Sequence, residues 1–131
     1  MHMDSAVSPR RSVQAALTFD SLWQPTLAAD RRGHPPARQM ILRAEEFDIH
    51  LKISGESNHR QMLGQILPRS ATSFVEFAKL HLMQNGERIE TATADETGEF
   101  RFINLPEGEL SLQIDLPHLT VVGSLNFREI P

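Results

Sequence analysis

Residues 95–112, DETGEFRFINLPEGELSL, constrain the fold of this chain more than any other stretch. Asp95 and Gly98 suit a tight turn, because an aspartate side chain bonds the backbone two residues on and glycine accepts a positive φ. Leu105–Gly108 suits a second turn, in which Pro106 presets φ. Apolar and polar residues alternate after each turn, which predicts two half-buried strands. The apolar positions of these two strands are Phe100, Phe102, Leu110 and Leu112.

The same period of two runs through most of the chain after residue 38. FDIHLKI (47–53), QMLGQIL (61–67), AKLHLMQ (78–84) and TVVGSLNF (120–127) each place small or apolar residues at every second position. Each segment is therefore expected to be a strand with one buried face. The inward positions include Phe47, Ile49, Leu51, Ile53, Met62, Gly64, Ile66, Ala78, Leu80, Leu82, Ile114, Val121, Gly123, Leu125 and Phe127.

Asn85 and Gly86 form the strongest hairpin signal in the sequence. Both central residues of a type I′ turn need positive φ, which Asn and Gly tolerate best. ERIETATA (87–94) then reads as the returning strand. With turn signals about every ten residues, the chain is predicted to be an all-β, antiparallel Greek-key sandwich of about seven strands.

Residues 1–37 differ from this pattern and are expected to be a mostly irregular arm outside a sandwich of residues 38–131. Val13, Ala16 and Leu17 fit one face of a short helix capped by Ser12 and ended by Pro25. The arm is also too apolar for a disordered tail, so part of it should pack on the body or on a partner. The candidate contact residues are Phe19, Leu22 and Trp23.

Composition narrows the function. The net charge is −4, divided as +3 over residues 1–43 and −7 over residues 44–131, and this acidic body disfavours nucleic acid. The absence of cysteine excludes disulfides and thiolate sites. We read neither a signal peptide nor a membrane-spanning run, and therefore expect a cytoplasmic protein that does not associate with membranes.

Residues 62–114 resemble the carboxypeptidase regulatory-like domain, a transthyretin-like (prealbumin-like) sandwich. The resemblance rests on MLGQIL, AKLHLMQNGE and TADETGEFRFINLPEGELSLQI, and RQMILRAEEFDIHLKI and FDSLWQP also resemble the front end of small bacterial stand-alone members. It implies a non-catalytic module that assists folding, docking or ligand presentation. The peptidase domain that accompanies this module elsewhere is not in these 131 residues.

The sequence gives little support for an enzyme of this fold class or for a metal site. Hydroxyisourate hydrolases and intradiol dioxygenases share the fold class, but they depend on tyrosines and this chain has none. The six histidines show no ligand spacing, so we expect no metal and no cofactor. Two alternatives stay open: calcium at Asp95, Glu96 and Glu99, and a Lys–Asn isopeptide from Lys52 or Lys79 with Asn126. Surface positions are the simpler interpretation of these residues.

The sequence thus favours a non-catalytic interaction or structural module. It would bind a protein partner, or a second copy, through the arm or through a sheet edge. A carbohydrate-binding module is the alternative, although sugar sites usually need exposed aromatic platforms and only Trp23 is a natural candidate. An enzyme is the third and weakest possibility, because no nucleophile–base pair or metal cluster can be named.

Overall fold

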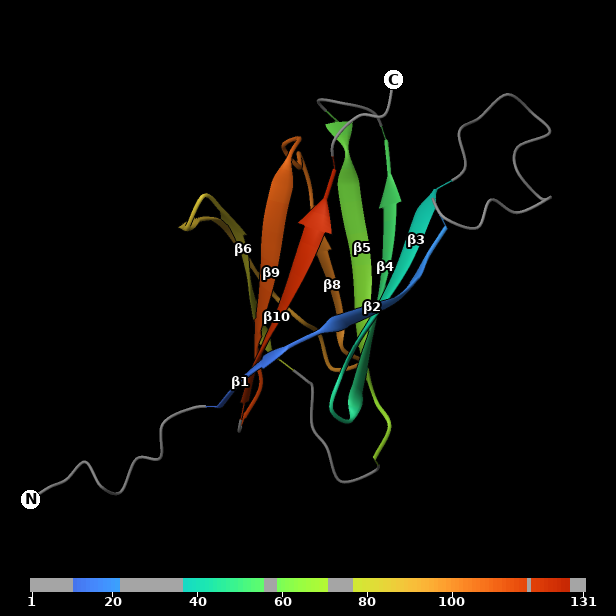
Figure 1. The fold of residues 1–131 in the computed structure, drawn as a ribbon, viewed down its shortest axis with the longest axis vertical. Helices are drawn as coiled ribbons and strands as arrows, with labels where there is room; N and C mark the ends of the chain where they lie inside the picture. The colour runs from blue at the N-terminus through green and yellow to red at the C-terminus, as the bar shows by residue number, and fades with distance from the viewer. Residues whose placement is uncertain (1–10, 22–36, 56–58, 71–76, 118, 128–131) are drawn as a thin grey trace, which may run out of the picture.

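In the computed structural model, residues 11–21, 37–55, 59–70, 77–117 and 119–127 are described. They form ten strands in two five-stranded sheets, which confirms the predicted all-β sandwich (Figure 1). Sheet A contains, in spatial order, β1 (Arg11–Gln14), β10 (Leu119–Asn126), β9 (Glu109–Asp115), β6 (Lys79–Gln84) and β7 (Glu87–Thr93). Sheet B contains β2 (Ala16–Asp20), β3 (Arg38–Ala44), β4 (Phe47–Ser54), β5 (Gln61–Pro68) and β8 (Glu99–Phe102).

The core lies between the two sheets and consists of the positions that the period of two predicts. Every apolar residue expected to face inward on β4 to β10 is buried, including Ile49, Leu80 and Leu112. Phe100 and Phe102 meet edge to face with ring centroids 6.1 Å apart. Leu105, from the second predicted turn, is buried with them. No helix among the described residues is long and apolar enough to cross a membrane.

The three predicted turns are present with the expected backbone. Asn85 and Gly86 have φ of 54° and 81°, as the hairpin signal requires. The N–H of Gly98 bonds the carbonyl of Asp95 at 3.0 Å, and Gly98 has a φ of 86°. Gly108 closes the Leu105–Gly108 turn at a φ of 107°. These turns fix the strand registers, since a slip of one residue would turn the buried face outward.

Gly64 on β5 has a packing role that goes beyond its place in the pattern. It lies opposite Phe100 of β8, and a Cβ atom at this position would overlap the Phe100 ring. The ring therefore lies over the glycine backbone, and β8 can approach β5 closely only because no side chain intervenes.

The N-terminal arm departs from the prediction. Residues 11–20 form β1 and β2 and not a short helix, because the edges of both sheets offer unpaired backbone groups in reach of this segment. We call residues 11–20 the strap. β1 runs parallel to β10, and after Ala15 the chain enters the other sheet as β2, antiparallel to β3. Figure 1 shows the strap crossing diagonally in front of both sheets.

β3 is a further strand that the sequence-based count of about seven did not include. It joins β4 through a two-residue turn at Glu45 and Glu46, with Glu45 at a φ of 56°. A glutamate in the left-handed region is uncommon. Because the turn contains no Gly, Asn or Asp, the sequence did not indicate a hairpin here. Residues 11–21 of the predicted arm thus belong to the sandwich.

Candidate functional site

The free edge of sheet A at β7 is the first candidate. The N–H of Ala94 bonds the carbonyl of Ala78 at 2.8 Å, so Ala94 and Ala92 direct their backbone groups toward β6. Because these directions alternate, the N–H and C=O groups of Thr91 and Thr93 point to the open edge. All residues of β7 except Ala92 are exposed, and no described strand pairs with this edge.

One half of β7 is protected against pairing. The register shifts where Leu82 faces Glu90 and Met83 faces Arg88, so Ile89 is an extra residue in a bulge. Bulges twist an edge away from a flat partner, and charged side chains on an edge disfavour pairing. This protection covers Glu87–Glu90 and leaves Thr91–Thr93 regular.

The other sheet ends are shorter or irregular. β8 and β1 each have four residues, and β2 has five with a register shift between Leu17 and Phe19. Thr18, at this shift, turns its hydroxyl to the carbonyl of Ile41 at 3.1 Å. Among the strands that the structure describes, β7 is therefore the longest free edge.

Thr91 is also the end of a hydrogen-bonded chain that crosses the outer face of sheet A. The His81 Nδ1 atom lies 3.2 Å from the Thr91 hydroxyl, and His81 Nε2 lies 3.1 Å from Asp115 Oδ2. Gln113 Nε2 and the Thr120 hydroxyl each donate to Asp115 Oδ1 at 3.2 Å. These hydrogen bonds link four strands of sheet A, namely β7, β6, β9 and β10, from the free edge inward.

The surroundings of Asp115 within this hydrogen-bonded series favour its ionised carboxylate. Partial burial acts to raise the pKa of Asp115, but the hydrogen bonds from Gln113, His81 and Thr120 outweigh it, and the pKa lies below its usual value. A neutral His81 fits if Nε2–H donates to Asp115 and Nδ1 accepts from Thr91; a protonated ring would donate at both atoms. The geometry satisfies either form, so it holds Thr91 in place in both.

A hydroxyl, an imidazole and a carboxylate in this order also occur in nucleophilic enzymes. Such a site needs in addition a place for the reacting atom and donors for the developing charge. Neither of the two hollows described below includes Thr91 or His81 in its lining. What the geometry shows is that these hydrogen bonds hold Thr91 at the edge of sheet A.

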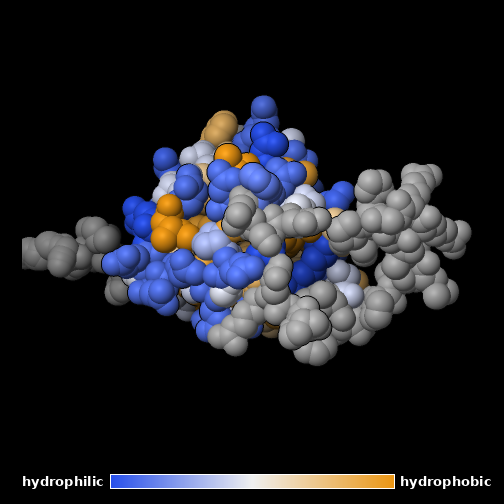
Figure 2. Space-filling model, turned by 90° about the horizontal axis from the view of Figure 1, so that it is seen from above, coloured by the Kyte–Doolittle hydropathy of each residue, from blue (hydrophilic) through white to orange (hydrophobic). Residues whose placement is uncertain are grey.

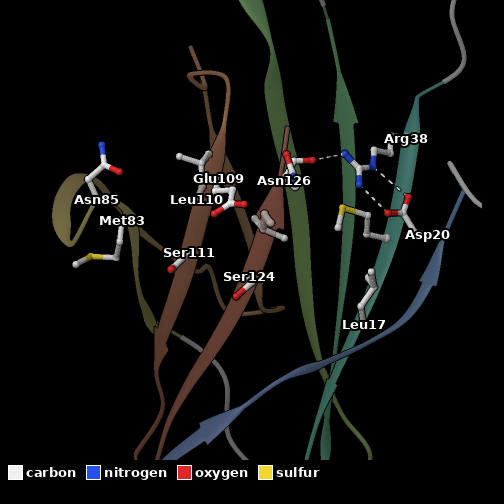
Figure 3. Close-up of a pocket in the computed structure, with 12 residues that line it drawn as sticks. Leu17, Asp20, Arg38, Met83, Asn85, Glu109, Leu110, Ser111, Ser124 and Asn126 are labelled. Carbon is white, nitrogen blue, oxygen red and sulfur yellow. Dashed lines mark hydrogen bonds and ion pairs between the residues drawn. The ribbon is translucent and has the colours of Figure 1, made fainter. Parts of the chain in front are cut away.

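The second candidate is a hollow of about 600 Å³ above the strap, lined by residues of β2 and β3, by the ends of β9 and of β10 (the upper half of β10, residues 123–126), and by Met83 and Asn85 at the β6–β7 hairpin. Figure 3 shows Ser124 and Asn126 on one side, Asp20 and Arg38 on the other, and Leu17 reaching up from the strap. Ser111 and Ser124 face each other as register partners on β9 and β10. The hollow is therefore a gap left where the strap departs from sheet A.

An ion pair, which we call the latch, closes one wall of the hollow. Arg38 Nε and Nη2 bond the two oxygens of Asp20 at 3.0 and 2.7 Å, and the Asp20 side chain is only 1% exposed. Arg38 Nη1 donates to the carbonyl of Asn126 at 2.7 Å. The guanidinium groups of Arg38 and Arg60 each lie 5.8 Å from the Phe127 ring centroid. The latch joins β2, β3 and β10 at one point.

A second, smaller hollow of about 300 Å³ lies on the outer face of sheet B, next to Ile41, His50 and Leu63. Neither this hollow nor the one above the strap has a Phe, Tyr or Trp side chain in its lining. The surface seen from above is mostly hydrophilic, with separate small apolar patches (Figure 2). The linings of these two hollows therefore do not provide the aromatic platform that the carbohydrate alternative needs.

The remaining residues singled out from the sequence lie as follows. Phe19 is half-buried on β2 opposite Ile41, while Leu22 and Trp23 lie outside the described residues. Lys52 and Lys79 are exposed, and Lys79 faces Asp115 at the end of sheet A remote from Asn126. The structure therefore does not bring Lys79 and Asn126 together.

Asp95, the centre of the calcium alternative, is occupied by the turn. Its Oδ1 accepts from the N–H and hydroxyl of Thr97, at 2.8 and 2.7 Å, and from the N–H of Glu99 at 3.0 Å. Within the described ranges, no three His, Cys, Asp or Glu residues are grouped as metal ligands would be.

Sequence reasoning missed Thr91, Thr93 and Ser124 as edge positions. The period of two gives the direction of each side chain, but it does not say which strand ends a sheet. No protein-family model matches the chain, and neither a curated protein nor a solved structure matches it. The resemblance to the carboxypeptidase regulatory-like domain stays a prediction.

Proposed function

We propose that this protein is a non-catalytic β-sandwich module that binds another protein chain by adding a strand to the edge of β7. The observation that carries the proposal is the outward direction of the backbone groups of Thr91 and Thr93 on an exposed edge. Strand addition takes its affinity from such main-chain hydrogen bonds.

The surroundings of this edge support binding over simple exposure. The bulge at Ile89 and the charges of Glu87, Arg88 and Glu90 limit pairing to one half of β7, which would keep the module from indiscriminate aggregation. The other half is held by the hydrogen bond between Thr91 and His81. An edge that is ordered before binding loses little conformational entropy when a partner strand docks.

The test is a proline that blocks the edge without breaking the sheet. Thr93→Pro removes an N–H that points outward, so the hydrogen bonds between β7 and β6 stay intact. Thr93→Val is the matched control, because it removes the hydroxyl and keeps the backbone donor. Proteins cross-linked to the wild-type chain and to Thr93→Val should be lost with Thr93→Pro, and a partner so identified should bind the purified chain at least tenfold more weakly after the proline change.

Self-association through the same edge would appear in sedimentation velocity. A dimer of the wild-type chain and of Thr93→Val should become a monomer in Thr93→Pro. If every partner and every oligomer survives the proline change while circular dichroism shows an intact fold, β7 is not the binding edge.

A further inference from the structure

The part of β10 around Ser124 is a second edge of sheet A that no described strand covers, and it lies inside the hollow above the strap. The N–H of Ala15 bonds the carbonyl of Val122 at 2.8 Å, and no described residue of the strap pairs with β10 beyond this point. By alternation, the N–H and C=O of Ser124 point to the same side as the carbonyl of Val122. Ser124 is exposed, so both groups are open to the hollow.

The free stretch is short because both of its ends are occupied. The strap covers β10 up to Val122, and the Arg38 guanidinium covers the carbonyl of Asn126. Residues 123–125 remain, about 10 Å of strand at roughly 3.3 Å per residue. The hollow therefore accommodates an extended segment of about three residues, in line with β1.

The two sides of such a segment would meet different surfaces. The side turned into the sandwich faces Leu125, Leu110 and Met40, which line the hollow, and the half-exposed Leu17 of the strap. The other side faces the outer surface of sheet A, where Ser111, Ser124 and Glu109 lie. Alternate residues of the segment should therefore be apolar and polar.

The charges beside the hollow indicate which polar residue the bound segment should carry. The guanidinium of Arg38 is already shared between Asp20 and the carbonyl of Asn126, so it offers no unneutralised charge. Glu109 is exposed and forms no ion pair with any residue that the structure describes. Together with the hydroxyls of Ser111 and Ser124, it makes the rim an acceptor for a primary ammonium, which donates three hydrogen bonds.

We propose that the hollow above the strap binds a short extended segment of a partner protein in which a lysine stands between two apolar residues. The backbone of the lysine pairs with Ser124, its ammonium reaches Glu109, and the flanking apolar side chains cover Leu125 and Leu17. This site is at the opposite end of sheet A from Thr93, so it does not depend on the proposed role of β7.

The experiment titrates the isotopically labelled full chain with acetyl-Leu-Lys-Leu-amide and follows the Ser124 and Glu109 amides by NMR. We expect saturable shifts confined to the hollow and the end of β10. Acetyl-Leu-Glu-Leu-amide should bind at least threefold more weakly. Glu109→Gln should weaken binding of the lysine peptide about two- to fivefold, as expected for an exposed ion pair.

Backbone pairing is tested separately from charge. A lysine peptide methylated on the backbone nitrogen of the lysine loses the N–H that donates to the carbonyl of Ser124. It should bind at least fivefold more weakly, and the protein itself is unchanged in this comparison. Thr93→Pro should leave the titration unchanged, which separates this site from β7. Equal binding of the lysine and glutamate peptides, no shift with either, or strong protection of the Ser124 amide from hydrogen exchange in the free chain would each overturn the proposal.

Discussion

The two narrow sides of the sandwich are closed in different ways. On the strap side, ten consecutive residues pair first with β10 and then with β3, and the latch fastens the end of β2. On the opposite side, β7 and β8 are joined only by the turn from Asp95 to Gly98, and both strands end their sheets. One side depends on contacts between distant parts of the chain and the other on contacts within a few residues.

This difference explains which sheet edges lack a strand partner among the described residues. The strap satisfies most backbone groups of the edges that it covers, but it crosses between sheets, so among the described residues no strand pairs with β10 around Ser124 on the side away from β9. The local turn on the other side brings β7 and β8 together without covering either strand. Free edges therefore remain at both ends of sheet A, one recessed behind Leu17 and one on the surface.

The same difference explains what the sequence could predict. Turns such as Asn85-Gly86 and Asp95–Gly98 have their causes within four residues, and the sandwich and most of its core followed from them and from the period of two. The strap follows from pairing over about a hundred residues between Arg11 and Leu119, which no local pattern encodes. The exposed pattern of Ala16, Leu17 and Thr18 likewise has no buried face to reveal a strand.

The largest expected effect comes from breaking the latch. Arg38→Met removes both hydrogen bonds and the positive charge that Arg38 supplies to the buried carboxylate of Asp20, and this should lower the free energy of unfolding by about 3–5 kcal/mol. Arg43→Met on the same strand removes an exposed pair with Asp48 and should cost at most about 1 kcal/mol. Urea unfolding measures both. Equal losses in the two variants would show that the strap side does not depend on the latch.

A smaller effect is expected on the other side, where β8 packs on β5. Gly64→Ala places a methyl group against the Phe100 ring and should cost about 1–3 kcal/mol by overpacking. The neighbouring change Leu63→Ala removes a half-exposed side chain and should cost less. If Gly64→Ala is as stable as wild type in urea, β8 can move away from β5 freely, and this side is looser than the packing indicates.

The smallest effect belongs to the turn between β7 and β8, and it depends on pH. The Thr97 hydroxyl and the N–H groups of Glu99 and Thr97 hold the pKa of Asp95 below its ordinary value of 3.8. Because the folded pKa is lowered, the ionised carboxylate stabilises the fold above that ordinary value. This contribution disappears as the pH falls toward the lowered pKa.

Asp95→Asn should therefore cost less stability at pH 7 than Gly64→Ala, and it should flatten the acid limb of the stability curve below about pH 5. Thr97→Val removes only the hydroxyl donor and should flatten that limb partly. Thermal unfolding between pH 3 and pH 7 provides the measurement, with Arg38→Met as a reference for the strap side. If the asparagine variant keeps the wild-type acid slope, the side closed by β7 and β8 does not depend on this turn, and its order must come from the packing of Phe100 on Gly64.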